Sequence, residues 1–326
     1  MKNLSSEPPK VYVIHENEEW AAPLLEALKS LGIPAEEWSI AEAVLNIQDV
    51  PPSGIFYSKA SASAHTRGHA SAIEFALPLV QWLESHGRRV INGGATIWTE
   101  ASKARQYQLL RQAGILIPKT FVANSPSTVL HAALQLAPSR VIVKPNRGGK
   151  GSGVQLFENG RALETVLADD NLESIDGLFI VQEYIESPSR QIVRMEFIGG
   201  KFQYAVSVDA SDGFELCPAD ACEIPAPSGN EAAPIQNKFE ILPKLKNPDI
   251  PMLERLMKEQ RIDIAGFEYV EDLKGRRFLY DINTNTNYNT DAETRAQVKP
   301  GLVRVSEFLG QELVHHYPSA LVADWD

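Results

Sequence analysis

The chain has 326 residues, a length that corresponds to two compact domains or one large multi-lobed unit. Hydrophobic residues make up 44% of it and charged residues 22%, which excludes a disordered or fibrous protein. The net charge of -11 repels phosphate backbones and anionic lipid surfaces, so the sequence argues against nucleic acid or a membrane as a partner.

Cysteine content and hydropathy indicate the compartment. The sequence contains only two cysteines, Cys217 and Cys222, and no further Cys or nearby His completes a zinc site or a disulfide framework. It also lacks a run of about 18 apolar residues that could cross a bilayer. We therefore expect a protein of the reducing cytoplasm.

Residues 1–98 alternate between strand and helix patterns, which favours a parallel sheet covered by helices. We predict a Rossmann-like α/β lobe here. The turn after its first strand is acidic and lacks glycine, which argues against dinucleotide binding by this lobe. The predicted elements are a strand at 10–17, a helix at 20–31, a strand at 54–57, a helix at 70–86 and a strand at 90–92.

Two further units are predicted. Residues 99–186 should hold a linker helix, capped by Thr99 and running to about Gln112, and then a small lid. Residues 187–326 should form a C-terminal lobe dominated by strands, with residues 223–251 looping over its surface. The elements expected in these units are a helix at 127–136 and strands at 141–144, 178–185, 191–198 and 201–208.

The first motif with a chemical meaning is VIVKPNRGGKGSGV at residues 141–154, a strand that ends in Lys144 and opens into a loop with four glycines. Glycines let backbone N–H groups converge on anionic oxygens, while Lys144, Arg147 and Lys150 add positive charge where a triphosphate would need it. The spacing matches neither a Walker-type P-loop nor G-x-G-x-x-G. Taken alone, the loop is equally well explained as a hairpin turn.

The second motif is a predicted hairpin with strands at 265–270 and 276–285. With a four-residue loop, Glu268 would pair opposite Leu279 and share a face with Asp281 and Asn283. Phe278, Tyr280 and Ile282 would point to the other face. Three oxygen-bearing side chains would then be placed to hold two Mg²⁺ ions. The alternative is a solvent-facing strand with acidic residues.

Taken in order, these motifs resemble the ATP-grasp superfamily over residues 90–290. The similarity is greatest to RimK-like α-L-glutamate ligases and the related glutathione synthetases and D-alanine ligases, which join a carboxylate to an amine. The resemblance implies an α/β protein, α+β in its ATP-grasp part, with a Rossmann-like N-terminal lobe followed by a two-part ATP-grasp fold with a mobile lid. It also implies ATP and Mg²⁺ as cofactors, with two ions bound and Mn²⁺ able to substitute.

The resemblance assigns roles to particular residues. Glu268, Asp281 and Asn283 correspond to the magnesium ligands. Where the family has an acidic residue for the ribose, this chain has Ser189, Arg190 and Gln191, so Gln191 or Glu186 is the candidate substitute. The residues implied to bind the nucleotide are Lys103, Lys144, Arg147, Gly148, Gly149, Lys150, Gly151, Ser152, Gln182, Glu183, Tyr184 and Ile185.

One departure from the family concerns the transition state. Gly266 stands where D-alanine ligases carry an arginine two residues before the first metal carboxylate. Arg194 is the candidate replacement, because glutamate ligases and glutathione synthetases have an arginine at the matching point of that strand. The alternative is a surface ion pair.

Substrate-binding candidates lie in two segments. Lys59 and Arg67, in the polar stretch at 58–69, are candidates for holding a carboxylate. Asn285 and Asn287 belong to an amide-rich run that begins at the end of the second strand of the predicted hairpin. They are candidates for binding substrate, and the alternative is that this run forms consecutive turns.

These expectations converge on an ATP-dependent carboxylate-amine ligase that forms an amide bond through an acyl phosphate, acting on an amino acid or a peptide. The alternatives are a kinase-like phosphotransferase and a non-catalytic nucleotide-binding protein. Small-molecule amino acids or peptides are the expected partners. The family also makes homo-oligomerisation an expectation.

Overall fold

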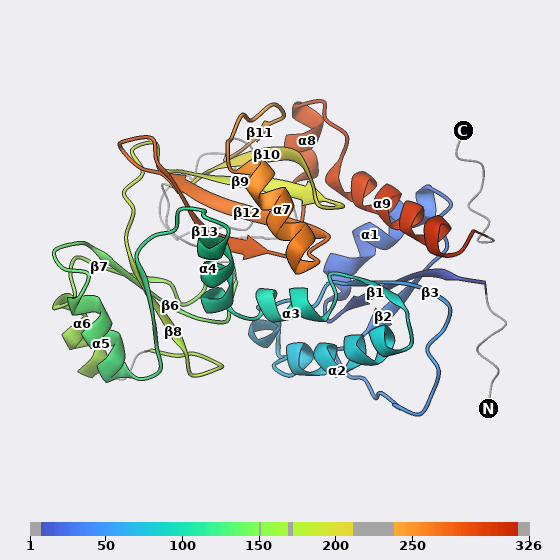
Figure 1. The fold of residues 1–326 in the computed structure, drawn as a ribbon, viewed down its shortest axis with the longest axis horizontal. Coiled ribbons are helices and arrows are strands. Elements are labelled where there is room, and N and C mark those ends of the chain that lie inside the picture. Colours follow the sequence, from blue (N-terminus) through green and yellow to red (C-terminus); the bar gives the residue numbers. More distant parts are fainter. Residues whose placement is uncertain (1–7, 150, 169–171, 211–237, 319–326) are drawn as a thin grey trace, which may run out of the picture.

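The structure, a computed structural model, describes residues 8–149, 151–168, 172–210 and 238–318. Its described residues form three β-sheets with helices packed against them (Figure 1). Two of the sheets share a core, and the third forms a smaller unit on one side of the molecule. In Figure 1 this smaller unit is the green part of the ribbon, at the left.

The N-terminal sheet is parallel, with strand order β2-β1-β3-β4. Alternation along β1 sends Val11 and Val13 to one face and Tyr12 and Ile14 to the other, where separate clusters form. Helices α1 and α9 pack on the first face, and α2 and α3 on the second. The elements are β1 (Lys10–His15), α1 (Glu18–Ser30), β2 (Ala35–Ser39), β3 (Gly54–Ser58), η2 (Ala64–Arg67), α2 (Ala72–Ser85), β4 (Arg89–Ile91), α3 (Gly94–Glu100) and α9 (Gly301–His316).

The second sheet is antiparallel, with strand order β11-β10-β9-β12-β13. One face packs on the apolar sides of α4 and α7. The opposite face carries Arg194, Glu196 and Glu268 at alternate positions and is turned partly toward a cavity. The elements are α4 (Lys103–Gln112), β9 (Gln191–Ile198), β10 (Lys201–Asp209), β11 (Phe239–Leu242), α7 (Ile250–Gln260), β12 (Ile264–Glu271), β13 (Arg277–Asn283) and α8 (Thr290–Arg295).

The third sheet is a small antiparallel unit with strand order β5-β8-β6-β7 and a core of its own. Helices α5 and α6 supply the apolar cover. Its other face carries Ile142, Lys144 and Gln182 and lines the cavity. The elements are β5 (Thr120–Ala123), α5 (Pro126–Leu134), β6 (Val141–Pro145), β7 (Gln155–Phe157), α6 (Ala162–Ala168) and β8 (Phe179–Glu183).

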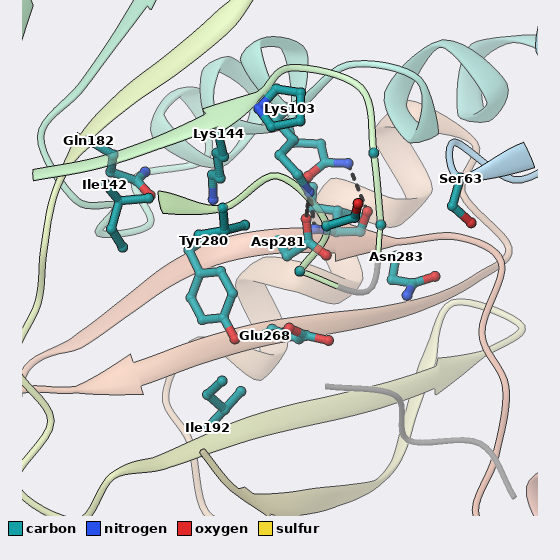
Figure 2. Close-up of a pocket in the computed structure, with 18 of the residues that line it drawn as sticks. Ser63, Lys103, Ile142, Lys144, Gln182, Ile192, Glu268, Tyr280, Asp281 and Asn283 are labelled. Carbon is teal, nitrogen blue, oxygen red and sulfur yellow. Dashed lines mark hydrogen bonds and ion pairs between the residues drawn. The ribbon is translucent and has the colours of Figure 1, made fainter. Parts of the chain in front are cut away.

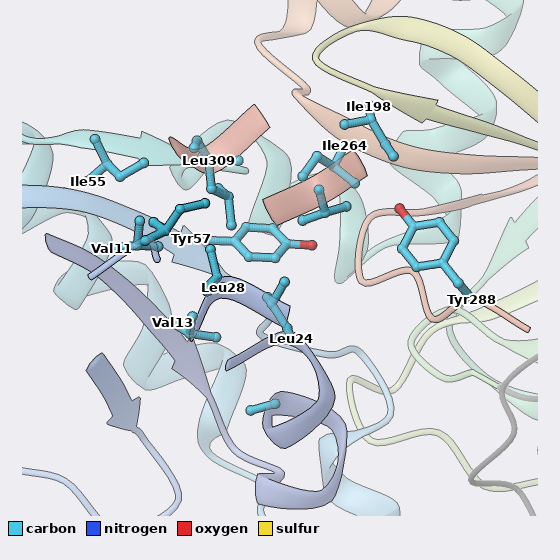
Figure 3. Packing of buried hydrophobic residues seen from close by; sticks show 14 of the residues in the cluster. Val11, Val13, Leu24, Leu28, Ile55, Tyr57, Ile198, Ile264, Tyr288 and Leu309 are labelled. Carbon is cyan, nitrogen blue, oxygen red and sulfur yellow. The ribbon is translucent and has the colours of Figure 1, made fainter. Parts of the chain in front are cut away.

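A single apolar cluster joins the N-terminal sheet to the second sheet. Val11, Leu24 and Tyr57 pack in it together with Ile264 and Leu309, the last from α9 (Figure 3). Each of these five side chains is at most 1% exposed. The first and last parts of the chain therefore form one packed body, with residues 120–183 attached beside it.

The mixed α/β class is confirmed, and several predicted elements need correction. The helix expected to start at Thr99 starts instead at Lys103: Thr99 lies in α3, and the Ser102 side chain caps α4 by accepting the Arg105 N–H at 3.3 Å. The surface loop expected at 223–251 contains β11 and the start of α7 within its described residues. The part up to residue 237, with Cys217 and Cys222, lies outside the described residues.

No helix among the described residues combines the length and apolar character that crossing a membrane requires.

Candidate active site

A cavity lies between the second and third sheets, beside the N-terminal lobe. Its wall combines the small sheet and the glycine loop, the second sheet, and the segment after β3. Figure 2 shows it running from Ile142 and Gln182 at one side, past Lys144 and Asp281, to Asn283 and Ser63 at the other. Segments distant in sequence thus build one site.

The Gln182 side of the cavity is largely apolar. Pro118, Ile142, Ile185, Ile192 and Val270 line it. The backbone N–H of Glu183 donates to the Lys119 carbonyl at 3.0 Å, whereas that of Ile185 has no partner within the described parts of the chain. An apolar slot beside a free backbone donor suits a flat heteroaromatic ring.

The glycine loop is anchored to the start of α4 through Asn146. This side chain is 2% exposed, and its Oδ1 accepts hydrogen bonds from the Ala104 N–H at 2.9 Å and the Ser102 hydroxyl at 3.2 Å. Lys103, the first residue of the helix, forms an ion pair with Asp281. Although burial opposes its charge, the Asp281 carboxylate raises the pKa of Lys103.

Lys144 reaches the same space from the strand that precedes the loop. Its ammonium lies 5.5 Å and 5.6 Å from the ring centres of Tyr107 and Tyr280. Burial, reinforced by the neighbouring Lys103 charge, lowers the pKa of Lys144 to about 7. Bound phosphates would supply the negative charge that this lysine lacks.

The pairing register of the hairpin formed by β12 and β13 differs from the predicted one. Glu268 pairs directly with Asp281, and the next pair is Tyr269 with Leu279, so Tyr280 is an extra residue in a β-bulge. Leu279 therefore turns into the core, while Tyr280 turns to the cavity and donates its hydroxyl to Glu268 Oε2 at 2.9 Å. The prediction that Tyr280 lies on the face away from Glu268 and Asp281 is wrong. Glu268, Asp281 and Asn283 all line the cavity.

Arg194 lies on β9 beside the first carboxylate and is only 2% exposed. Its Nε lies 2.7 Å from Glu196 Oε1, and its Nη1 lies 3.6 Å from Glu268 Oε1. A β-carbon built on Gly266 would lie 2.5 Å from Arg194 Nε, so the bare glycine provides the space that the guanidinium occupies. Arg194 is thus a buried cation on the cavity wall, and the surface ion-pair interpretation is wrong.

Four predicted site residues do not line the cavity. Arg147 forms an ion pair with Glu74 of α2, and Arg67 forms one with the buried Glu16. Lys59 is buried behind the wall, where its Nζ donates to the Thr286 carbonyl at 3.4 Å, and Gln191 is exposed at the start of β9. Lys150 lies outside the described residues.

The remaining predicted residues line the cavity. They are Lys103, Lys144, Gly148, Gly149, Gly151, Ser152, Gln182, Glu183, Tyr184, Ile185, Arg194, Glu268, Asp281, Asn283, Asn285 and Asn287.

Sequence reasoning missed several wall residues, among them Trp20, Ser61, Ser63 and Glu100. Glu100 Oε1 accepts the Ala62 N–H at 3.2 Å, and its Oε2 accepts the Thr284 N–H at 2.8 Å. This carboxylate therefore joins the segment after β3 to the loop after β13. A glutamate at the end of an amphipathic helix carries no sequence signal for such a role, which only the fold reveals.

Residues 100–214 match the family model of the RimK-like ATP-grasp domain. This part of the chain is therefore similar to RimK-like ATP-grasp domains. A curated relative from Enterobacter sp. (strain 638), named a probable alpha-L-glutamate ligase, is 28% identical over 169 residues. That match covers 48% of this chain and 56% of the relative, so it spans about half of each protein.

Solved ATP-grasp structures share the fold across nearly the whole chain. A RimK domain protein from Sphaerobacter thermophilus aligns with a TM-score of 0.63 and 17% identity, covering 94% of this chain and 99% of that one. The ATP-grasp ligase PsnB, solved with a precursor variant, Mg and ADP, aligns with a TM-score of 0.62 and 15% identity, covering 92% and 97%. At such identities the likeness concerns the fold.

ATP and Mg²⁺ are the cofactors of the ATP-grasp family, and the wall residues fit the metal. Burial, together with the opposed Asp281 carboxylate, raises the pKa of Glu268. A divalent cation held by Glu268, Asp281 and the Asn283 amide oxygen would offset that repulsion, and these are ligands that Mg²⁺ prefers. When bound, it would neutralise charge on phosphate oxygens.

Proposed function

We propose that the protein is an ATP-dependent carboxylate-amine ligase that forms a carbon–nitrogen bond and releases ADP. The observation that carries this proposal is the single cavity in which Lys103 and Lys144 face Glu268 and Asp281 beside the glycine loop. The relatives named glutamate ligases and the precursor-bound PsnB support an amino acid or a peptide as substrate.

Each part of the cavity has a role in the proposed reaction. The apolar slot and the Ile185 N–H would hold adenine, while Lys144 and the loop amides would hold the phosphates. Glu268, Asp281 and Asn283 would hold two Mg²⁺ ions, with Mn²⁺ able to substitute. Gln191 is exposed and does not line the cavity, so we do not assign the ribose contact to it.

The reaction would proceed in two displacements. A carboxylate oxygen of the first substrate attacks the γ-phosphorus, the bond to the β-phosphate oxygen breaks, and ADP leaves with the electron pair. The amine nitrogen of the second substrate then attacks the acyl carbon. The carbon–oxygen bond to phosphate breaks, inorganic phosphate leaves, and the nitrogen loses a proton. Arg194 would stabilise negative charge that develops on the reacting oxygens.

The domain arrangement belongs to the same proposal. Residues 1–98 would contribute to substrate binding, residues 99–186 would form the linker and the closing lid, and residues 187–326 would hold the metal. Lid closure would keep water away from the acyl phosphate. A cytoplasmic location and homo-oligomerisation stay predictions.

The test is release of ADP and phosphate from Mg-ATP across a panel of carboxylate and amine pairs, with mass spectrometry of the products and Asp281→Ala as control. Hydroxylamine replaces the amine in a parallel series and traps an acyl phosphate as a hydroxamate. We expect release to require both substrates, to disappear in Asp281→Ala, and to yield a product whose mass is the sum of the two less water.

Other outcomes contradict the proposal in distinct ways. A stable phosphorylated product formed from one substrate alone would identify a kinase-like phosphotransferase. ATP binding without turnover on any pair would favour a regulatory nucleotide-binding protein.

A further inference from the structure

The end of the cavity farthest from the adenine slot differs in chemistry from the rest. Trp20, Ser61 and Ser63 line it from the N-terminal lobe, and Asn285 and Asn287 from the loop after β13. Figure 2 shows Ser63 and Asn283 on this side, opposite Gln182. A substrate reaching past the phosphates would meet these residues.

Asn285 presents an unsatisfied acceptor. The side chain is 6% exposed, and its Nδ2 donates to the Lys59 carbonyl at 3.0 Å. Because a carbonyl can only accept, this bond fixes which end of the amide is nitrogen. Its Oδ1 is buried and has no hydrogen-bond partner among the described residues. A buried amide oxygen without a partner is unfavourable, so a substrate bound at this wall is expected to donate an N–H or O–H group to it.

The two nearby cations are already engaged. Arg67 pairs with Glu16, stacks on the Trp20 ring at 4.3 Å, and donates to Ser63 Oγ at 3.0 Å. The Lys59 ammonium is turned to the Thr286 carbonyl behind the wall. Both groups therefore stabilise the segment after β3 and do not face a ligand.

The acidic group at this end is Glu100: burial raises its pKa, whereas the hydrogen bonds that it accepts from Thr284 and Ala62 favour its carboxylate form. Glu100 lines the cavity, and both of its oxygens accept hydrogen bonds from the surrounding segments. A carboxylate beside a neutral acceptor attracts an amine and repels a second carboxylate. The Trp20 ring adds an apolar surface.

We infer that this end is the amine subsite, in which the substrate nitrogen donates to Asn285 Oδ1, and that it selects amines without an acidic side chain. The inference rests on the proposed function and narrows it. Although the relatives are named glutamate ligases, L-glutamate is here a poor amine substrate, because its side-chain carboxylate would meet Glu100 and no free cation among the described wall residues of this end.

The first arm of the test uses the full chain, Mg-ATP and the carboxylate that supports ADP release in the panel above. L-glutamine and L-glutamate serve as the amines, because they have nearly the same shape and differ in side-chain charge. We expect kcat/KM to be higher for L-glutamine by about tenfold or more.

The second arm compares two variants, Asn285→Leu and Asn285→Asp. Both lose the bond to the Lys59 carbonyl, but only the aspartate keeps an acceptor oxygen. We expect Asn285→Leu to raise KM for the amine about tenfold while KM for ATP is unchanged. Asn285→Asp should raise KM for the amine by a smaller factor.

Three results would overturn the inference. A preference for L-glutamate, with ADP still released, contradicts the subsite and leaves the ligase intact. Equal KM values for the amine in both variants contradict the role of Oδ1. If no carboxylate and amine pair supports ADP release, the proposed function and the inference fail together.

Discussion

Gly266 and Arg194 share one space at the centre of the second sheet. Gly266 pairs with Glu196 across the β9–β12 register, and the Arg194 guanidinium fills the volume where a side chain at 266 would begin. The arginine that D-alanine ligases carry at the glycine's position therefore has no room in this chain. The guanidinium reaches the cavity from the neighbouring strand instead.

We expect Gly266→Ala to displace Arg194 and to slow ADP formation roughly a hundredfold, the scale seen when one transition-state donor is removed. The crowded β-carbon should also lower the free energy of unfolding by about 1–3 kcal/mol, measured by urea denaturation. Gly94→Ala is the control, because its β-carbon has 3.4 Å to the nearest atom. Unchanged activity in Gly266→Ala would exclude Arg194 from the reaction.

Tyr280 contacts two groups of the proposed site at once, through its hydroxyl to Glu268 and its ring to Lys144. We expect Tyr280→Phe to weaken Mg²⁺ binding by about tenfold or more, since Glu268 loses a hydrogen bond worth about 1.5–3 kcal/mol, and to leave metal-free nucleotide affinity unchanged. Calorimetric Mg²⁺ titration of the nucleotide complex measures this. Tyr269→Phe, the adjacent tyrosine on the core face, should behave as wild type.

Lys144 gives nucleotide binding a defined pH dependence. Its pKa is lowered to about 7 in the free protein, so above pH 7 the ammonium is mostly deprotonated. Phosphates bind the charged form, so binding must take up a proton. Affinity for metal-free ADP should therefore fall as pH rises from 7 to 9, at most about tenfold per unit. Lys144→Arg should flatten the profile, because arginine stays protonated. An unchanged slope would contradict this role.

At the residue scale the sequence predicts which groups meet, but not how they are oriented. Glu268, Asp281 and Asn283 lie together as expected. The bulge at Tyr280 depends on which residues pair across β12 and β13, and alternation along one strand carries no information about pairing. Arg67 and Arg147 do not line the cavity but pair with acidic residues that are distant in sequence, and sequence pattern does not reveal such partners.

At the scale of elements, the glycine loop touches the N-terminal lobe directly. Arg147 of the loop pairs with Glu74 of α2, and a β-carbon on Gly149 would lie 3.2 Å from Ser63 Cβ. These contacts cover one side of the cavity.

We expect Glu74→Ala to speed hydrogen exchange of the loop amides at 146–149 and 151–154, since the loop loses its partner on α2. Global stability should change by less than about 1 kcal/mol, because Glu74 is half exposed and exposed ion pairs contribute little. Arg147→Ala should give the same pattern, and the double variant should add nothing further. Additive effects would mean that the two side chains act separately.

Several of the smaller elements that sequence reasoning missed carry no clear pattern in the sequence. The edge strand β2, with sequence AEEWS, is mostly exposed and has no apolar run to mark it. Strand β7 is three residues long, too short for a pattern. The break between α3 and α4 lies within a continuous helical periodicity and is set by the Ser102 cap. Length and a buried face were not sufficient either, because α9 spans 16 residues and buries Leu309, yet the sequence predicts a lobe dominated by strands there.

At the scale of the whole molecule, the core does not follow the order of the chain. The cluster with Val11, Tyr57 and Leu309 crosses the predicted boundary at residue 98, while residues 120–183 keep a separate cluster. Hydrophobic pattern predicts that a residue is buried but not which distant segment buries it. Only the folded structure reveals that the first and last units act as one body.

We expect Leu309→Ala, at a fully buried position, to cost about 2–5 kcal/mol. Hydrogen exchange should accelerate together in β1 and β9, because both strands border the same cluster. Val129→Ala, in the core of the small unit, should accelerate exchange only within residues 120–183. Acceleration confined to α9 after Leu309→Ala would contradict a single cooperative body.

The position of α9 has a consequence for synthesis of the protein. This helix packs on β1, β3 and α1, which leave the ribosome far earlier. Until residues 301–316 emerge, the face of the N-terminal sheet that carries Val11 and Ile55 lacks part of its cover. The nascent chain must keep that apolar surface from aggregating throughout most of translation, so we expect chains stalled before α9 to bind chaperones and to resist folding.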